Sequence, residues 1–190
     1  MRILMLGNSY TFVNDLPSMI AQITGAEVVN HTRGGARLSE QLNPVTRMGA
    51  LTIEALEKEK WDYVVLQEMS NAAIKFKKSF RKSVTALCEK IRQAGATPVL
   101  YATWAYKDGS VPMEKMGMTY EEMERQMYQS FHEVGDKNGM LIADVGRAFF
   151  EKNKEINLYH DDGSHPNMEG SKLAAEIIAK VIMGHAWERE

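Results

Sequence analysis

Two short segments near opposite ends of the chain carry side chains that could act together in nucleophilic catalysis. Ser9 follows a short apolar run and a glycine, Gly7, which permits a tight turn into the segment that holds the serine. In the second segment, Asp162 precedes His165 by three residues. An aspartate in such a turn can accept a hydrogen bond from histidine Nδ1–H, which leaves Nε2 free as a general base. The three residue types predict a serine nucleophile that is activated by His165, with Asp162 orienting the imidazole.

Each segment also has a simpler interpretation. Residues 7–11 could form a turn or a phosphate-binding loop, although the further glycines of a Rossmann fingerprint and the Gly-Lys-Ser/Thr of a Walker loop are absent. The 160–165 loop contains four potential metal ligands without a recognised ligand spacing. These are His160, Asp161, Asp162 and His165. Two alternatives to a serine enzyme therefore stay open: a non-catalytic ligand-binding module, and a metal-dependent hydrolase that uses the 160–165 loop.

A serine nucleophile also needs hydrogen-bond donors for the negative charge that develops on the substrate oxygen. The backbone N–H of Ser9 itself is one candidate. Gly34 and Gly35 follow the second apolar run, where a backbone without side chains lets N–H groups approach a ligand. Gln67 and Asn71, at and after the end of the third run, offer side-chain amides. One such donor is typically worth about 3 kcal/mol of transition-state stabilisation.

Two aromatic residues, Trp104 and Tyr106, lie at and just after the end of the fourth apolar run. Their position suits two roles, the lining of a substrate pocket and the packing of the core or of a lid. We assign them to the substrate pocket as a prediction.

The elements that must position these residues form an alternation of apolar runs and helical stripes. Five runs of four to eight residues are apolar on both faces, which is typical of strands buried in a parallel sheet. They are Arg2–Leu6, Glu27–His31, Asp62–Gln67, Thr97–Trp104 and Met140–Val145. Two helical stripes end at Gly95 and Gly139, and a last helix is expected from about Met168 to Met183. The stripes comprise Phe80, Val84, Leu87 and Ile91, and Tyr120, Met123, Met127, Phe131 and Val134.

This alternation predicts an α/β architecture of βαβ units with right-handed crossovers. We expect one domain over residues 1–190 with a flavodoxin-like three-layer αβα sandwich, in which a five-stranded parallel sheet has the order 2-1-3-4-5. In such sheets the ligand site lies beyond the carboxyl ends of the strands. Chemistry is therefore expected in the segments after each run, which are residues 7–17, 32–38, 68–74, 105–118 and 153–167.

The composition is that of an ordinary globular chain. Of 190 residues, 44% are hydrophobic and 25% are charged, and the formal net charge of −2 gives no support for a nucleic-acid or anionic-membrane partner. The one cysteine, Cys88, excludes an internal disulfide and lies in an apolar run, where packing is its expected role. No apolar stretch reaches the roughly 20 residues of a membrane span, and no signal-peptide pattern is present. We therefore expect a cytoplasmic location, unless a leader has been removed.

Three segments resemble the sequence blocks of the SGNH hydrolases, also called the GDSL family. Residues 7–11, Gly-Asn-Ser-Tyr-Thr, resemble the first block, usually Gly-Asp-Ser, with Asn8 in place of the usual aspartate. Residues 30–35 resemble the second block, whose glycine amide serves the oxyanion hole, and this role falls on Gly35. The pair Asp162-x-x-His165 matches the last block, in which the aspartate orients the histidine that activates the serine.

The third block departs from the family pattern. The usual Gly-x-Asn-Asp lacks its glycine and its final aspartate here, and counting from the strand places Asn71 at the family's asparagine. However, the sequence Leu-Gln-Glu-x-Ser at residues 66–70 resembles a variant subgroup related to carbohydrate acetylesterases, in which Gln67 would be the oxyanion donor. We therefore favour Gln67 as the side-chain donor and hold Asn71 as the second choice.

The resemblance extends over nearly the whole chain and implies a serine esterase of the carboxylic ester hydrolase class. It implies an acyl-enzyme on Ser9 and a small ester substrate, such as one with an O-acetyl group on a carbohydrate. No metal and no organic cofactor are needed for this chemistry. The oligomeric state is not predicted.

Overall fold

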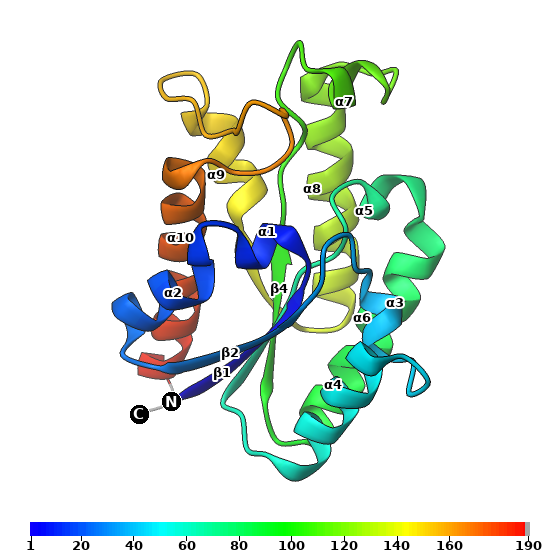
Figure 1. The fold of residues 1–190 in the computed structure, drawn as a ribbon, viewed down its shortest axis with the longest axis vertical. Helices are drawn as coiled ribbons and strands as arrows, with labels where there is room; N and C mark the ends of the chain where they lie inside the picture. Colours follow the sequence, from blue (N-terminus) through cyan, green and yellow to red (C-terminus); the bar gives the residue numbers. More distant parts are fainter. Residues whose placement is uncertain (189–190) are drawn as a thin grey trace.

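The computed structural model describes residues 1–188, and its five parallel strands form one sheet in the order β2-β1-β3-β4-β5 (Figure 1). The predicted fold class and strand order are therefore confirmed. The strands are β1 (Arg2–Gly7), β2 (Glu27–Thr32), β3 (Tyr63–Leu66), β4 (Thr97–Ala102) and β5 (Leu141–Asp144). Each lies within its expected apolar run, apart from one added residue at the end of β1 and of β2.

Burial distinguishes the central strands from the two edges. Every residue of β3 is buried, and so are all but the first residues of β1 and β4. By contrast, β2 has no fully buried residue and β5 has one. The expectation that all five runs are buried on both faces is therefore wrong for the edge strands, because less of the molecule covers the sheet there.

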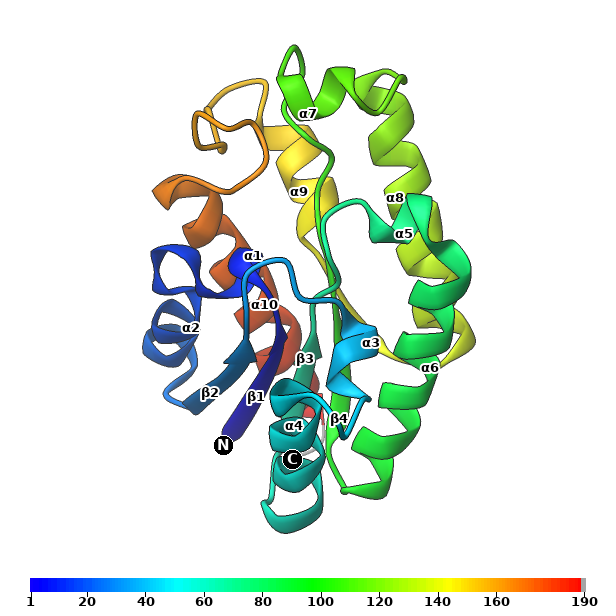
Figure 2. The same ribbon diagram turned by 45° about the vertical axis from the view of Figure 1, so that its right-hand side comes forward.

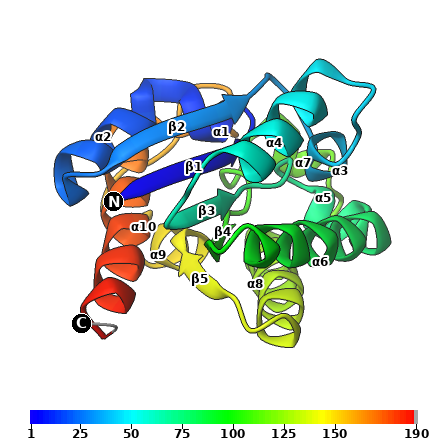
Figure 3. The ribbon, with the colours of Figure 1, turned by 90° about the horizontal axis from the view of Figure 1, so that it is seen from below.

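Helices cover both faces of this sheet and make a three-layer sandwich (Figure 3). One face packs against α2, α9 and α10, and the other packs against α4, α6 and α8. Side chains alternate between these layers along β1, so that Ile3 and Met5 enter one core and Leu4 and Leu6 enter the other. The longer helices are α2 (Leu16–Thr24), α4 (Arg47–Lys58), α6 (Lys77–Gln93), α8 (Tyr120–Lys137), α9 (Val145–Lys152) and α10 (Met168–Glu188).

The parallel register brings the carboxyl ends of the strands to one edge of the sheet. Gly7 is paired with Thr32, and Leu66 is paired with Leu6 and Leu100. The segments after β1 to β4 consequently leave the sheet side by side, and short helices follow them (Figure 2). These are α1 (Ser9–Phe12), the 3₁₀ helix η1 (Val13–Asp15), α3 (Leu38–Gln41), α5 (Ala72–Lys75) and α7 (Val111–Glu114).

The predicted helical stripes are buried as expected. All nine stripe residues of α6 and α8 lie in the core, and Gly95 and Gly139 adopt positive φ angles of 80° and 56° just after those helices end. Helix α10 continues to Glu188, beyond the expected end at Met183. None of the helices within residues 1–188 is both long enough and apolar enough to cross a bilayer.

Candidate active site

Ser9 is the first residue of α1, immediately beyond the central strand β1. Asn8 caps this helix, because its side-chain oxygen accepts a hydrogen bond from the N–H of Tyr10 at 3.1 Å. Its side-chain nitrogen donates to the carbonyl of Ala36 at 3.0 Å, which ties the loop after β2 to the serine segment. Ser9 is therefore fixed by a strand end, a helix cap and a neighbouring loop. Its own N–H lies in the first turn of the helix, where backbone donors have no acceptor within the helix.

Gln67 braces the serine segment from within the core. Its side chain is 1% exposed, and its Oε1 accepts hydrogen bonds from the N–H of Asn8 at 2.8 Å and from the hydroxyl of Thr11 at 3.0 Å. Its Nε2 donates to the carbonyl of Glu68. A Cβ at Gly7 would lie 2.5 Å from Gln67 Oε1, so only glycine leaves room for this brace. These contacts commit the Gln67 amide to supporting the serine and weigh against the predicted role of oxyanion donor.

The second-choice amide, Asn71, is less committed. Asn71 precedes α5, and its Oδ1 is buried without a hydrogen-bond partner. Its Nδ2 contacts the sulfur of Met116 at 3.9 Å, a weak interaction. Rotation of the amide by 180° exchanges the two atoms, so that an N–H donor can occupy the unpaired position. Burial raises the pKa of the Tyr106 phenol, and a hydrogen bond from Asn71 acts to lower it. Which of the two amides serves the substrate oxygen stays a prediction.

The other half of the site is the irregular segment between α9 and α10. Asn167 caps α10 through a hydrogen bond from the N–H of Gly170, and Gly163 turns the chain with a φ of 70°. Asp162 Oδ1 accepts hydrogen bonds from the backbone N–H groups of Ser164 and His165, each at 2.9 Å. Asp162 Oδ2 lies 2.5 Å from His165 Nδ1. Asp162 therefore fixes His165 at two points, its backbone N–H and its ring Nδ1.

The electrostatics of this turn favour an ionised aspartate. Partial burial acts to raise the pKa of Asp162, but the hydrogen bonds from the His165 side chain and from two backbone N–H groups outweigh it, and the pKa is lowered. The carboxylate can then hold the Nδ1–H tautomer of His165, with Nε2 as an acceptor. The Asp162 and His165 side chains are 44% and 34% exposed, so the site is open to solvent.

The two halves meet at the serine. His165 Nε2 lies 2.8 Å from Ser9 Oγ, although 156 residues separate them in the sequence. Ser9, His165 and Asp162 thus form a continuous hydroxyl–imidazole–carboxylate chain. The predicted constellation is brought together at the expected edge of the sheet. Gly35 lies in the loop that Asn8 holds, with an exposed backbone and a φ of 67°.

The two predicted pocket residues are both buried. Trp104 is 1% exposed, and its ring stacks between Tyr10 and Phe149, with centroid distances of 4.8 and 4.0 Å. The burial and stacking of Trp104 favour its packing alternative, since a ring stacked inside the core offers almost no surface to a substrate. Tyr106 is 7% exposed, and its hydroxyl is 2.7 Å from Ser70 Oγ in the loop after β3.

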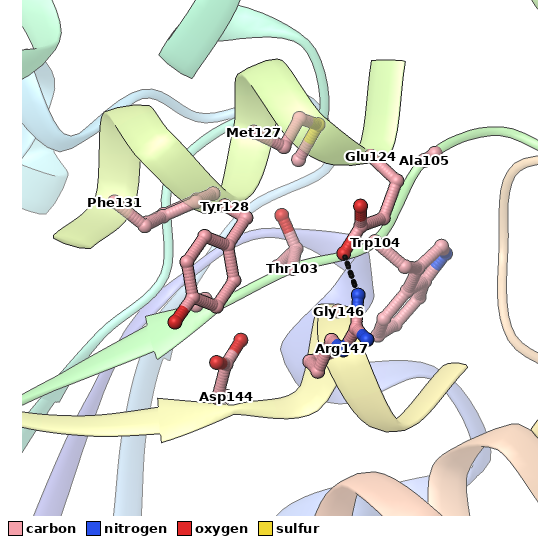
Figure 4. A pocket seen from close by; sticks show the side chains of 11 residues that line it. Thr103, Trp104, Ala105, Glu124, Met127, Tyr128, Phe131, Asp144, Gly146 and Arg147 are labelled. Atoms are coloured by element: carbon pink, nitrogen blue, oxygen red, sulfur yellow. Dashed lines mark hydrogen bonds and ion pairs between the residues drawn. The ribbon is translucent and has the colours of Figure 1, made fainter. Parts of the chain in front are cut away.

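Trp104 also borders one small cavity. This space of about 10 Å³ lies between α8 and the start of α9, with Thr103, Glu124 and Arg147 around it (Figure 4). A volume of this size holds about one water molecule. Glu124 and Arg147 form an ion pair at 3.4 Å on its wall, so the cavity is a packing feature and too small for an ester.

Sequence reasoning missed Asn14, which joins the serine segment to the segment that carries His165. Asn14 donates from Nδ2 to the carbonyl of Pro166 and to the hydroxyl of Ser171, at 3.1 and 2.9 Å. Its φ of 56° is one that asparagine tolerates better than most residues. An asparagine–aspartate pair just before a helix was the available signal. The partners, however, lie more than 150 residues away.

The arrangement of side chains in the 160–165 loop gives no support for a metal site. His160 and Asp161 are exposed. Within residues 1–188, no three His, Cys, Asp or Glu side chains are grouped closely enough to hold a metal ion. The 160–165 loop instead directs His165 and Asp162 towards Ser9.

Comparisons with known proteins agree with this geometry. Residues 5–178 match the GDSL-like lipase/acylhydrolase family. A proposed SGNH hydrolase from Slackia heliotrinireducens is 46% identical, with 96% of this chain and 98% of that chain covered and a TM-score of 0.93. A DUF4886 family protein from Bacteroides uniformis is 19% identical, with 97% and 83% covered and a TM-score of 0.77.

An acetylxylan esterase from Geobacillus stearothermophilus shares the fold at 13% identity, with 95% of this chain and 93% of that chain covered and a TM-score of 0.67. No curated protein matches this chain. The family match extends over most of the chain, and a relative of 46% identity covers nearly all of it. The chain therefore belongs to the GDSL-like lipase/acylhydrolase family, the SGNH hydrolases, and is a carboxylic ester hydrolase.

Proposed function

We propose that the protein hydrolyses small carboxylic esters through an acyl-enzyme on Ser9, with His165 as general base and Asp162 orienting it. The observation that carries this proposal is the chain of contacts from Ser9 Oγ to His165 Nε2 at 2.8 Å and from His165 Nδ1 to Asp162 at 2.5 Å. These distances suit proton transfer without rearrangement of the backbone.

The reaction follows from these positions. His165 Nε2 takes the Ser9 proton as Oγ attacks the acyl carbon, and the imidazolium then protonates the leaving alcohol. Water then attacks the acyl carbon while His165 takes its proton, and the imidazolium returns that proton to Ser9 Oγ as the bond between Oγ and the acyl carbon breaks and the acid leaves. The carboxylate of Asp162 stabilises the imidazolium in both half-reactions. Every proton that moves is carried by His165, so the chemistry requires no cofactor.

The negative charge on the tetrahedral intermediate needs donors near Ser9. We assign this role to the backbone N–H groups of Ser9 and Gly35 and to one side-chain amide. Asn71 is the better side-chain candidate, because Gln67 is occupied in bracing Asn8 and Thr11. Ser9 and Gly35 stand on neighbouring segments that the Asn8–Ala36 hydrogen bond joins.

The substrate class we favour is an O-acetyl ester on a carbohydrate. A structural neighbour of low identity is an acetylxylan esterase, which supplies the precedent for this fold. A half-exposed Ser9 and a solvent-open histidine also suit an acyl group on a large polar leaving group better than a buried lipid chain. A screen of acetylated sugars and of p-nitrophenyl esters of rising chain length tests this choice. Faster turnover of long acyl chains than of acetate would reject it.

The decisive experiment for the mechanism is Ser9→Ala. Turnover of p-nitrophenyl acetate should fall by about 10⁶-fold, since removal of the nucleophile costs as much as removal of a whole triad. Ser18→Ala, an exposed serine on α2, is the matched control and should keep full activity. Retained activity in Ser9→Ala would reject the proposed mechanism.

Two further readouts separate the alternatives. A fluorophosphonate probe should label wild-type protein at Ser9 and leave Ser9→Ala unlabelled, whereas a non-catalytic binding module would take no label. Hydrolysis by a metal-dependent enzyme would stop after treatment with a chelator, and hydrolysis by the serine mechanism would not.

A further inference from the structure

Tyr10, the residue after the nucleophile, reaches across to the turn that carries His165. Its side chain is 3% exposed, and its hydroxyl lies 2.6 Å from Ser164 Oγ. Burial raises the pKa of the Tyr10 phenol, so it stays protonated and keeps a hydrogen available for this bond. Ser164 lies between Asp162 and His165 in the chain and donates its N–H to Asp162 Oδ1. One hydrogen bond therefore joins the serine helix to the centre of the Asp–His turn.

Aromatic packing reinforces the same connection. The Tyr10 ring lies parallel to that of Trp104, with an interplanar angle of 9°, and meets the His165 ring edge-on at 5.4 Å. Trp104 in turn donates from Nε1 to the carbonyl of Ser164 at 3.1 Å. The hydroxyl and the carbonyl of Ser164 are thus both held by a stacked pair of rings that lies against α1 and His165.

From these contacts we infer that Tyr10 is a positioning residue, which holds His165 Nε2 at Ser9 through Ser164 and Trp104. The inference rests on the proposed function, because it assigns Tyr10 to the Ser9–His165–Asp162 mechanism. The segment from Asn153 to Asn167 contains no helix or strand of its own, so the position of His165 depends on contacts from elsewhere. A displacement of about 1 Å at a reacting group can cost about 100-fold in rate.

Tyr10→Phe tests this role, because it removes the hydroxyl and keeps the ring. We expect kcat for p-nitrophenyl acetate to fall by about 10- to 100-fold with little change in KM, because the histidine is displaced and the substrate contacts are not. Ser164→Ala should give a similar loss. The double variant should be no slower than the slower single variant, because both changes remove the same bond.

Tyr63→Phe is the matched control. Tyr63 is also a buried tyrosine with a hydrogen-bonded hydroxyl, 3.0 Å from His185 Nδ1, but it lies at the opposite end of the sheet. This variant should keep wild-type kcat even if its melting temperature falls. Equal kcat losses in Tyr10→Phe and Tyr63→Phe would overturn the inference, and so would a wild-type kcat in Tyr10→Phe.

Proton NMR gives a readout that does not need turnover. The proton between His165 Nδ1 and Asp162 should resonate far downfield in the wild type and should broaden or shift in Tyr10→Phe, but not in Tyr63→Phe. An unchanged resonance in Tyr10→Phe would overturn the inference. Failure of the proposed function is a separate result, since activity that survives Ser9→Ala rejects the mechanism whatever the resonance shows.

Discussion

Ser9 and His165 meet at one point, but different kinds of structure hold them there. Ser9 stands where the central strand β1 passes into α1, and its neighbours are fixed by a helix cap and by the buried Gln67 amide. His165 stands in a long irregular segment, and its backbone is held only by hydrogen bonds within the turn and by contacts from other elements. The nucleophile is positioned by a buried strand end and its helix, whereas the base is positioned by hydrogen bonds within an irregular turn and from neighbouring elements.

Substitutions near Ser9 and substitutions near His165 should therefore have different first effects. A substitution near Ser9 disturbs a buried strand end and should first lower the free energy of unfolding. A substitution near His165 disturbs a half-exposed turn and should first lower kcat. Contacts such as Lys107 N–H to the carbonyl of Gly163 at 2.8 Å and Asn14 to Pro166 belong to the second class.

The largest contrast is expected for Asp162→Asn. The amide would favour the wrong tautomer of His165 and leave Nε2 unable to accept the Ser9 proton, so kcat should fall by about 10⁴-fold. Asn8→Ala is the corresponding change at the serine, where loss of the cap should cost about 1 kcal/mol of stability and much less activity. Steady-state kinetics and thermal unfolding of both variants measure the two losses. An Asp162→Asn enzyme that keeps more than a tenth of wild-type kcat would contradict the view that changes in the His165 turn act mainly on activity.

A smaller contrast is expected between the two side-chain amides. Asn71→Ala should lower kcat by about 10²–10³-fold and change the melting temperature little, because it removes an oxyanion donor. Gln67→Ala leaves the N–H of Asn8 and the hydroxyl of Thr11 without an acceptor in the core, at about 1–3 kcal/mol of stability. Kinetics and unfolding measured on both variants assign the roles. The sequence-based ranking would be restored if only Gln67→Ala lowered kcat in protein that remains folded.

These roles show how far sequence reasoning extends. Strand order and the meeting of Ser9 with His165 and Asp162 follow from the alternation of runs and from the rule that parallel strands end at one edge. The direction of a side-chain amide does not follow, because the partners of Gln67 are set by packing between β1 and β3. Trp104 was ambiguous for the same reason, since a strand end can face either a cleft or the core.

The Tyr10 contacts lie still further from what a sequence shows. Tyr10 and Ser164 are 154 residues apart, and neither residue type is unusual in its segment. The exposure of an edge strand, by contrast, could have been recognised. The run at Glu27–His31 contains the polar residues Glu27, Asn30 and His31, and the predicted order 2-1-3-4-5 already places this strand at an edge of the sheet, where it has no fully buried residue.

The smallest expected effects come from two glycine substitutions, one in each region. Gly7→Ala places a Cβ 2.5 Å from Gln67 Oε1 and Thr11 Oγ1, and such overpacking in a core costs about 1–3 kcal/mol. In a chain of this size that lowers the melting temperature by about 2–4 °C per kcal/mol. Gly163 is buried as well, and Gly163→Ala forces a side chain onto a φ of 70° and to within 2.3 Å of Ser110 Cβ, but it lies in an irregular segment outside the sheet, which can shift more easily than a strand end.

Gly163→Ala should therefore lower kcat by about tenfold or less, through displacement of His165, with a smaller change in melting temperature than Gly7→Ala causes. Thermal unfolding and kinetics measured on the two variants side by side decide the matter. If Gly163→Ala lowers the melting temperature as much as Gly7→Ala does, the turn unfolds together with the core. The base would then be held as firmly as the nucleophile, because a segment that melts with β1 shares its stability.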